Sequence, residues 1–302
     1  MRHAMAMDWD KLRVFHAVAE AGSFTHAGDV LNLSQSAVSR QVSSLEESLQ
    51  VPLFHRHARG LMLTEQGEIL FKSAREILAK LNMAEARISE SRERPKGPLK
   101  ITTTIAFGSI WLAPRLKEFL EDNPDIEVSL VLTDNELDLS MREADVGIRM
   151  TTPTQSDLIQ RRLMTLKYHV FAAPAYLQKH GMPRTPGDLD QHRLVVFGEE
   201  ARPPVPNLNW LLEAGSRDGG KRKAFLRVNS TYAIFRAVQS GIGIGALPHY
   251  LNYETGNLVE ILPELRGPDL DVYFVYPEEL RHSSRITLFR QFILRKVEEL
   301  TN

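Results

Sequence analysis

The 302-residue sequence contains no cysteine. This absence excludes disulfide bonds, thiolate metal sites and thiol redox sensing, and it argues against a secreted disulfide scaffold. No apolar run approaches the roughly 20 residues that a helix needs to cross a bilayer, and the N-terminus lacks the apolar segment of a signal peptide. We therefore expect a cytoplasmic protein with no membrane partner. Residues 1–6, ahead of Met7, take no part in the fold prediction.

The sequence also lacks an overall excess of positive charge. Lys and Arg number 37 against 38 Asp and Glu, which gives a formal net charge of -1 at pH 7. A surface that binds nucleic acid would therefore have to be local. Hydrophobic residues make up 43% of the chain and charged residues 25%, as in an ordinary soluble globular protein. The length allows two or three domains.

The first fifty residues carry the spacing of three short helices. Apolar residues recur at helical intervals from Trp9 to Ala21, and Gly22 then ends this helix. Ser23 can cap a second helix, and Ser34 opens a third after a brief turn. The apolar residues of the third helix share one face: Val38, Val42, Leu45 and Leu49. Two short helices joined by a tight turn, the second with a polar outer face, form a helix-turn-helix pattern.

The polar face of the third helix is the first candidate binding surface. It presents Gln35, Ser36, Ser39 and Arg40, with Ser34 at its start. Short hydroxyl and amide groups would let the helix approach the major groove of DNA closely, and Arg40 can reach a phosphate or the acceptor edge of guanine. An ordinary solvated helix face explains the same residues equally well, because helix-turn-helix patterns are easily imitated.

A short hairpin, or wing, is expected directly after this helix. Two β-like runs in LFHRHARGLMLTEQG surround the segment from Arg56 to Gly60. His55, Arg56, His57 and Arg59 would place cations beside DNA phosphates, so binding should depend on salt. The two histidines could also bind a metal, but no Asp, Glu or His at suitable spacing completes a set. We therefore predict no metal site and no cofactor.

A long helix is predicted after Thr64, which can cap it. Its apolar residues alternate at spacings of four and three: Leu70, Ala74, Ile77, Leu81, Ala84 and Ile88. This is a heptad pattern flanked by charges of both signs, and it favours pairing with the same helix of a second copy. Pro95, Gly97 and Pro98 then mark a hinge.

Beyond the hinge, strand-like and helix-like segments alternate. The strands LKITTTI, IEVSLVLT and DVGIRM are separated by expected helices at residues 111–120 and 137–143, an order that predicts a mostly parallel sheet covered by helices. A second unit begins near Tyr168 and includes LVVFG, LRVN, a helix at 232–239 and IGIGALP. The strand VYFVYP and a helix at 284–300 return to the first unit. We therefore expect two α/β lobes joined by two crossing strands.

The N-terminal tract resembles the DNA-binding domain of LysR-type transcriptional regulators. The most specific parts are LSQSAVSRQVSSLE, VPLF followed by x-R, and LTEQG. Within the family, the sequence is most similar to the VtlR/LsrB group of alphaproteobacterial regulators. It departs from the family at Gly28, where alanine is usual; we expect this glycine to loosen the second helix by up to about 1 kcal/mol without altering a contact.

The expected DNA-binding domain is not basic as a whole. Between Met7 and Thr64, five basic residues stand against six acidic ones. The basic residues are Lys11, Arg13, Arg40, Arg56 and Arg59. Affinity must then depend on where the last three of these arginines lie.

The resemblance implies an organisation for the whole chain. The fold class is α/β, with an all-α winged helix-turn-helix domain at residues 7–64, a linker or dimerisation helix at 65–94 and a two-lobed effector domain at 95–302. That domain would be similar to periplasmic binding proteins, with lobe I at 97–167 and 269–302 and lobe II at 168–268. The family implies a dimer of dimers that binds double-stranded promoter DNA, with RNA polymerase as a further partner.

The resemblance also implies a small effector between the two lobes. Hydroxyls and backbone N–H groups at strand ends suit an anionic or hydroxylated molecule. Each threonine or serine could instead cap a helix, Phe107 and Trp111 could pack the lobe, and Arg149 could form a salt bridge near the crossing strands. The residues at the corresponding positions are Thr103, Thr104, Ala106, Phe107, Thr133, Arg149, Phe197, Asn229 and Ser230.

Three classes of function compete for this sequence. The leading one is a sequence-specific DNA-binding transcriptional regulator controlled by an effector. The second is a ligand-binding and oligomerisation module without specific DNA binding. An enzyme is disfavoured: GIGIGA, Gly241 to Ala246, follows a predicted helix, so a tight turn explains its glycines better than a nucleotide site does. The sequence also has no G-x-S-x-G or G-K-[ST] motif.

Overall fold

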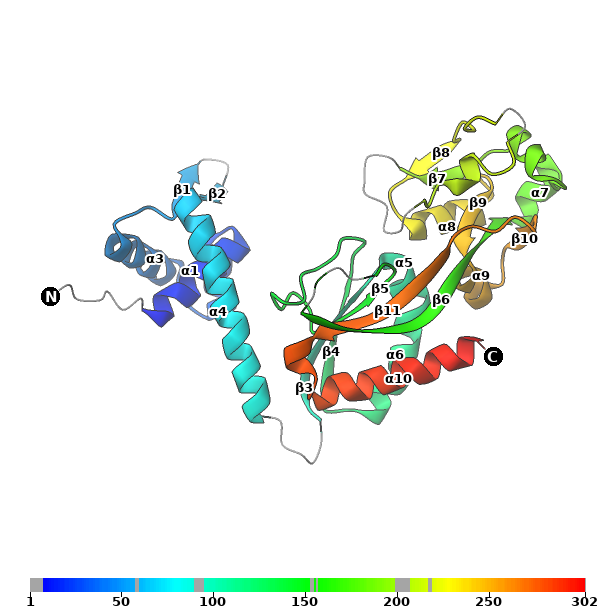
Figure 1. Cartoon of the computed structure of the whole chain (residues 1–302). Coiled ribbons are helices and arrows are strands. Elements are labelled where there is room, and N and C mark those ends of the chain that lie inside the picture. The colour runs from blue at the N-terminus through cyan, green and yellow to red at the C-terminus, as the bar shows by residue number, and fades with distance from the viewer. Residues whose placement is uncertain are drawn as a thin grey trace. The chain divides into compact units, whose positions relative to one another are not determined.

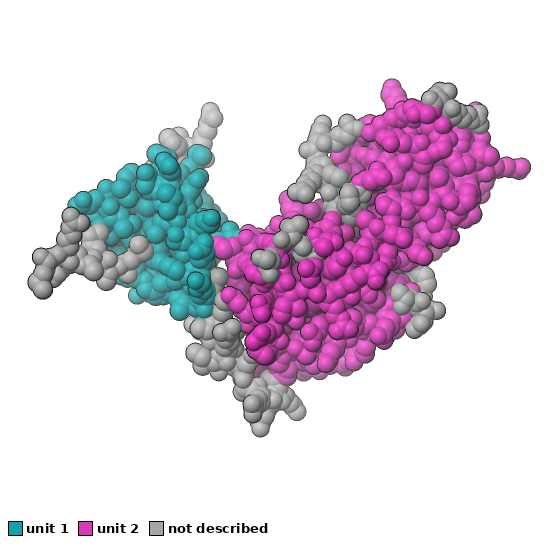
Figure 2. Space-filling model, in the orientation of Figure 1, with its two compact units in different colours: residues 1–89 teal, residues 90–302 magenta. Residues whose placement is uncertain are grey.

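A computed structural model of the chain divides into two units, residues 1–89 and 90–302 (Figures 1 and 2). The structure describes residues 8–57, 60–89, 95–152, 155, 157–198, 207–216 and 219–301. None of the helices within these ranges is both long enough and apolar enough to cross a membrane.

Capping residues set the helix boundaries of the first unit. Gly22 ends the first helix with a left-handed backbone (φ 60°), a conformation that glycine adopts without steric cost. Ser23 and Ser34 each accept a hydrogen bond from the backbone N–H three residues further on, so both predicted caps are confirmed. The elements are α1 (Trp9–Ala21), α2 (Phe24–Leu31), α3 (Gln35–Leu49), β1 (Phe54–His57), β2 (Gly60–Leu63) and α4 (Glu65–Ser89).

The core of the first unit buries one face of α3. Val38, Val42 and Leu45 are at most 1% exposed and belong to the same apolar cluster as Phe15 of α1. Phe15 also contacts Phe54 at the start of the hairpin, with ring centroids 5.3 Å apart. Because this face is committed to the core, the opposite face of α3 is left to solvent.

Gly28 lies in the second half of α2 and packs against the turn that leads into α3. A Cβ at this position would come within 2.6 Å of the carbonyl oxygen of Leu33, and the Leu33 N–H donates to the Gly28 carbonyl at 2.9 Å. The expectation that this glycine touches no contact is therefore wrong. The missing side chain lets the turn pass close to the helix.

The predicted hairpin forms, and Glu46 holds it against α3. β1 and β2 pair in antiparallel register. One carboxylate oxygen of Glu46, near the end of α3, accepts hydrogen bonds from the N–H groups of Leu53 at 2.7 Å and Phe54 at 3.2 Å. These two bonds fix the start of the hairpin relative to the helix.

The long helix α4 begins at a cap formed by Thr64. Its hydroxyl accepts from the Gly67 N–H at 3.0 Å and donates to the Pro52 carbonyl at 2.8 Å. The same hydroxyl therefore starts α4 and ties it to the segment that leads into the hairpin.

Some apolar residues of α4 are buried in the first unit, and others are exposed to solvent. Ala74 is fully buried in the core of the first unit, and Leu70 packs against that core. The expectation that these two residues face a second copy is therefore corrected, because their own domain covers them. Ile77 and Leu81 are each 42% exposed. The side chains of the remaining two heptad positions, Ala84 and Ile88, lie outside the described part.

A seven-stranded sheet runs through the second unit in the order β10-β6-β11-β5-β3-β4, and β9 also pairs with β6. β3 pairs in parallel with β4 and β5, whereas the pairings made by β6 and β11 are antiparallel. The prediction of a mostly parallel sheet is wrong, because the chain leaves on β6 and returns on β11 in the opposite direction. The strands are β3 (Gly97–Thr103), β4 (Ile126–Leu132), β5 (Val146–Arg149), β6 (Leu158–Ala172), β7 (Val195–Phe197), β8 (Leu226–Val228), β9 (Gly245–Pro248), β10 (Val259–Ile261) and β11 (Asp269–Pro277).

β6 and β11 are the two long strands that cross the second unit (Figure 1). Up to Lys167, β6 pairs with β11. From Tyr168 onwards it pairs with β9 and β10 instead. We refer below to the two sides of this change of partner as the first and second lobes. One apolar core cluster contains residues of both.

Helices cover the sheet of the second unit. α6 and α10 pack through aromatic rings, with Phe119 lying 5.3 Å from both Phe289 and Phe292. The helices are α5 (Ile105–Phe107), α6 (Ala113–Asp122), α7 (Pro174–His180), α8 (Thr231–Gln239), α9 (His249–Thr255) and α10 (Ser284–Thr301). Short 3-10 or π-helical turns lie at Gly108–Leu112, Pro186–Gln191, Trp210–Leu212 and Glu278–Leu280.

The predicted helix at residues 137–143 does not form. This segment consists of turns, in which the Asp138 carboxylate accepts from the Met141 N–H at 3.1 Å and the Glu143 carboxylate accepts from the Asp138 N–H. Acidic side chains close to their own backbone N–H groups compete with helix formation in this way.

Glu46→Ala should lower the free energy of unfolding of the full-length chain by about 1–3 kcal/mol, because two backbone N–H groups lose a charged acceptor. Glu46→Gln retains an oxygen that can accept both bonds and should cost less. Chemical denaturation followed by circular dichroism measures both changes, with Glu47→Ala, an exposed neighbour, as the control. Equal effects of the Ala substitutions at Glu46 and Glu47 would contradict this role.

Candidate functional site

The solvent face of α3 gathers the residues that the sequence singled out. Gln35, Ser36 and Arg40 are exposed, and Ser39 is half-buried. Ser34 accepts the Ala37 N–H at 3.2 Å as the helix cap and lies 3.1 Å from the Ser36 hydroxyl. Arg40 forms no hydrogen bond or ion pair with any residue that the structure describes. Its guanidinium is therefore available to a partner.

The hairpin beside this face carries the other predicted cations. Arg56 lies on β1 opposite Leu61 of β2, and its side chain is outside the described part. Arg59 lies outside the described residues altogether. Since Glu46 fixes the hairpin to α3, the backbone of β1 keeps a defined place next to the exposed helix face.

A second candidate site consists of two adjoining hollows in the second unit. The first hollow, about 370 Å³ with its open mouth, lies at the ends of β3, β4 and β5. The second, about 320 Å³, lies between the lobes. Thr104 and Met150 line both, so the hollows adjoin each other. The second hollow is lined by Thr104, Ala106, Met150, Leu166, Tyr168, Thr231, Pro248, Tyr250 and Leu270.

Asp134 supplies a carboxylate to the first hollow. It follows the last threonine of the β4 segment, and one of its oxygens accepts the Ile105 N–H at 3.2 Å. The other oxygen is buried and has no hydrogen-bond partner among the described residues. Burial raises the pKa of this carboxyl, and the bond from the Ile105 N–H opposes the increase.

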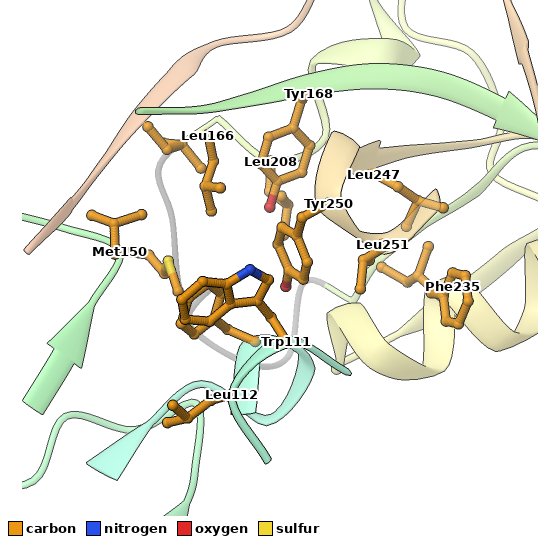
Figure 3. Close-up of a cluster of buried hydrophobic side chains, with 14 of the residues drawn as sticks. Trp111, Leu112, Met150, Leu166, Tyr168, Leu208, Phe235, Leu247, Tyr250 and Leu251 are labelled. Atoms are coloured by element: carbon orange, nitrogen blue, oxygen red, sulfur yellow. The ribbon is translucent and has the colours of Figure 1, made fainter. Parts of the chain in front are cut away.

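Tyr168 and Tyr250 supply hydroxyls from the second lobe. Figure 3 shows both rings reaching towards Trp111, with their hydroxyl ends leading. Burial raises the pKa of both phenols far above the neutral range, and the negative charge of Asp134 contributes to the increase. Both hydroxyls therefore stay protonated and can donate a hydrogen bond.

Aromatic rings and an ion pair connect the lobes beside these hollows. Phe107 stacks on Trp111 at 4.7 Å and meets Tyr250 edge-on at 5.5 Å. Arg115 of α6 forms a 2.6 Å ion pair with Glu254 of α9. Arg115 also donates to the Trp111 carbonyl at 2.9 Å and lies over the Trp111 ring. Packing between lobes, the alternative role considered for Phe107 and Trp111, is what the structure shows.

The first-lobe residues predicted to contact an effector come together here. Thr104 lines both hollows, Thr103 and Thr133 line the first, and Ala106 lines the second. The Thr103 hydroxyl is already used, because it donates to the Ile148 carbonyl at 3.0 Å. The Thr104 side chain makes no cap bond to α5, so the cap alternative does not apply to it.

The second-lobe residues predicted for the same role lie elsewhere. Phe197 is buried and exchanges two backbone hydrogen bonds with the Asn209 amide. Ser230 caps α8 by accepting the Ala233 N–H at 3.4 Å, and Asn229 beside it is exposed. None of the three predicted residues lines either hollow as described.

Arg149 forms a salt bridge, the alternative considered for it. It lines the first hollow and is only 7% exposed. One guanidinium nitrogen donates to the Leu137 carbonyl at 2.6 Å, and another lies 3.8 Å from a Glu136 carboxylate oxygen. The local turn and Glu136 therefore already engage its charge.

Sequence reasoning missed the residues that carry most of the polar chemistry of the hollows. Asp134 directly follows Thr133 at the carboxyl end of a parallel strand, where ligands of α/β sheets bind, and that position was a usable signal. Tyr168 and Tyr250 resemble core aromatics in the sequence, and only the packing of two distant segments brings them together.

The enzyme-like GIGIGA stretch has a structural role. The GIGIGA stretch follows α8 and enters β9, and a Cβ on Gly243 would come within 2.4 Å of the Arg193 carbonyl oxygen. Its glycines therefore serve a close turn, as the alternative interpretation held. The described residues contain no cluster of three or more His, Asp or Glu side chains that could hold a metal ion.

Family models match both units. The model of the bacterial regulatory helix-turn-helix proteins of the lysR family matches residues 9–68, and the model of the LysR substrate binding domain matches residues 92–298. Together they cover the helices around α3, the hairpin and the two hollows.

Individual proteins agree with these models. The chain is similar to the HTH-type transcriptional regulator CrgA of Neisseria meningitidis serogroup C, with 32% identity over 302 residues and 99% of each chain covered. The solved structure of CrgA from Neisseria meningitidis superposes with a TM-score of 0.60, covering 98% of this chain and 100% of that one. The full-length structure of the Vibrio cholerae virulence activator AphB has 26% identity, a TM-score of 0.60 and coverage of 96% and 99%. The chain belongs to the LysR family of DNA-binding transcriptional regulators and is not an enzyme.

Proposed function

We propose that this LysR-type regulator reads double-stranded promoter DNA with the exposed face of α3. The observation that carries the proposal is the two-sided character of this helix. Val38, Val42 and Leu45 are buried, while Arg40 on the other side has no partner among the described residues. The neighbouring side chains on that face are short, so the helix can approach the groove closely enough for Arg40 to reach a base edge. They are Ser34, Gln35, Ser36 and Ser39.

Anchoring to the DNA backbone would come from Arg56 and Arg59 of the hairpin. Their position in the sequence supports this role, because Arg56 lies on β1 and Arg59 comes between β1 and β2 in the sequence, and the start of β1 is bonded to Glu46 near the end of α3. Because these cations would neutralise phosphates, the affinity should fall steeply as the salt concentration rises, while the preference for one sequence is retained.

Two copies would pair along α4. Ile77 and Leu81 keep much of their surface exposed, and Ile69 on the same helix is 65% exposed. With about 100° per residue, these three side chains fall within about 120° of the helix circumference. They form the proposed dimerisation surface, together with the predicted Ala84 and Ile88. The two DNA-binding domains of such a pair would bind two half-sites of the operator. Further association would give a dimer of dimers.

A small molecule in the adjoining hollows would control the regulator. The hollows lie between the lobes, so a ligand that prefers one lobe arrangement shifts the population towards it. An anionic ligand would need a free cation, and Arg149 is already engaged by Leu137 and Glu136. A hydroxylated ligand would find partners in Asp134, Tyr168 and Tyr250.

We also propose a cellular location, a protein partner and a subgroup of the family for this regulator. A DNA reader would work in the cytoplasm of a bacterium, and RNA polymerase would be the partner through which bound regulator acts on transcription. The helix-turn-helix tract supports placing the chain with the VtlR/LsrB group of the family.

Arg40→Ala should weaken binding to the specific operator by about 1–3 kcal/mol, which is roughly 5- to 150-fold in dissociation constant. Genome-wide mapping of bound sites supplies the operator, and a gel-shift titration measures the change. Arg161→Ala, an exposed arginine of the second unit, is the matched control. If Arg40→Ala bound like wild type, α3 would not be the recognition helix. A lack of sequence preference at every salt concentration would favour a ligand-binding module without specific DNA binding.

Ile77→Glu should dissociate the paired form, raising the dimer dissociation constant by about tenfold or more, because the interface would have to bury a carboxylate. Sedimentation velocity over a range of concentrations measures the change. Lys72→Glu introduces the same carboxylate at an exposed position elsewhere on α4 and should leave the association state unchanged. Equal association of the two variants would contradict the proposed dimerisation surface.

A further inference from the structure

The charges around the two hollows leave one carboxylate without a counterpart. Arg149 is the single cationic side chain among the described residues that line them, and Glu136 and the Leu137 carbonyl engage it. Glu136 is also bonded to the Thr151 hydroxyl at 2.9 Å. Among the described residues, Asp134 accepts a hydrogen bond only from the Ile105 N–H, on one oxygen. The Asp134 carboxyl therefore has no cationic partner within the described lining.

The second carboxylate oxygen of Asp134 is an acceptor that a ligand could use. It is buried and has no partner among the described residues. A buried acceptor in this state costs free energy that a donor can recover. Asp134 lines the first hollow, which shares Thr104 and Met150 with the hollow lined by Tyr168 and Tyr250.

The described lining of the second hollow offers hydroxyls and apolar surface but no charged side chain. Tyr168 and Tyr250 are 4% and 2% exposed, and neither hydroxyl has a hydrogen-bond partner among the described residues. Met150, Leu166 and the aromatic cluster of Figure 3 supply the apolar surface around them. Such a site combines one anionic acceptor, two hydroxyls and an apolar wall.

We propose that the effector of this regulator is a compact cationic molecule, whose ammonium group pairs with the free oxygen of Asp134 and whose carbon framework packs against the Tyr168 and Tyr250 side. This inference rests on the proposed role of the hollows as the effector site and replaces the anionic or hydroxylated ligand expected from the sequence. A charge-assisted hydrogen bond to a desolvated carboxylate is among the stronger polar contacts a ligand can make.

The ligand's charge can be varied while its size stays nearly constant. Propyl, cyclohexylmethyl and benzyl frameworks are each offered as the amine and the alcohol, with propionate, cyclohexanecarboxylate and benzoate as the corresponding carboxylates. The thermal shift of the full-length chain is measured at equal probe concentration near neutral pH. We expect amines to stabilise the wild type more than the alcohol and the carboxylate of the same framework. This ranking needs no variant.

Asp134→Asn removes the charge but keeps an oxygen that can accept the Ile105 N–H. Calorimetric titration of the best amine should show about a tenfold or greater loss of affinity in this variant. Asp122→Asn, an exposed aspartate at the end of α6, is the matched control and should bind the amine like wild type.

Four results would overturn the inference. One is that no amine stabilises the wild type; another is that the alcohols or carboxylates stabilise it as well as the amines do. The third is equal amine affinity in wild type and Asp134→Asn. A carboxylate that binds wild type and loses affinity in Tyr250→Phe would overturn the cationic ligand while leaving the effector site in place. None of these measurements depends on DNA binding, which the Arg40 variant tests separately.

Discussion

The second unit depends on one strand that serves two lobes. β6 is hydrogen-bonded to β11 up to Lys167 and to β9 and β10 from Tyr168 onwards, without a break in the chain. A movement of one lobe against the other must therefore bend the backbone where the partners change. Tyr168 lies at that place and also lines the hollow between the lobes. A molecule that touches its hydroxyl acts directly on the residue about which the lobes would turn, so binding and lobe arrangement are mechanically linked.

In the first unit, several contacts hold the exposed face of α3 in a fixed position. α3 commits one face to the core, and Glu46 bonds the following hairpin to the same helix. Thr64 then links the end of the hairpin to α4. The exposed face of α3 thus keeps a fixed relation to the helix proposed to pair with a second copy. In a nearly neutral protein, such fixed placement substitutes for a broad basic surface.

Local patterns in the sequence were enough to predict the first unit, because its elements are set by capping residues and apolar spacing. Gly22, Ser23, Ser34 and Thr64 all end or begin helices as expected. The second unit was predicted only in outline. Sheet direction depends on how β6 and β11 meet, and these strands are separated by almost a hundred residues. The hollow was missed in part for the same reason: Tyr168 and Tyr250 lie on separate segments, and an aromatic residue in a buried run resembles core until its hydroxyl is seen to face a cavity.

The ion pair between Arg115 and Glu254 ties the two lobes to each other with groups that belong to the chain itself. It joins them at 2.6 Å, next to the stacked rings of Phe107 and Trp111. Any change in the angle between the lobes must therefore either break this pair or turn about it.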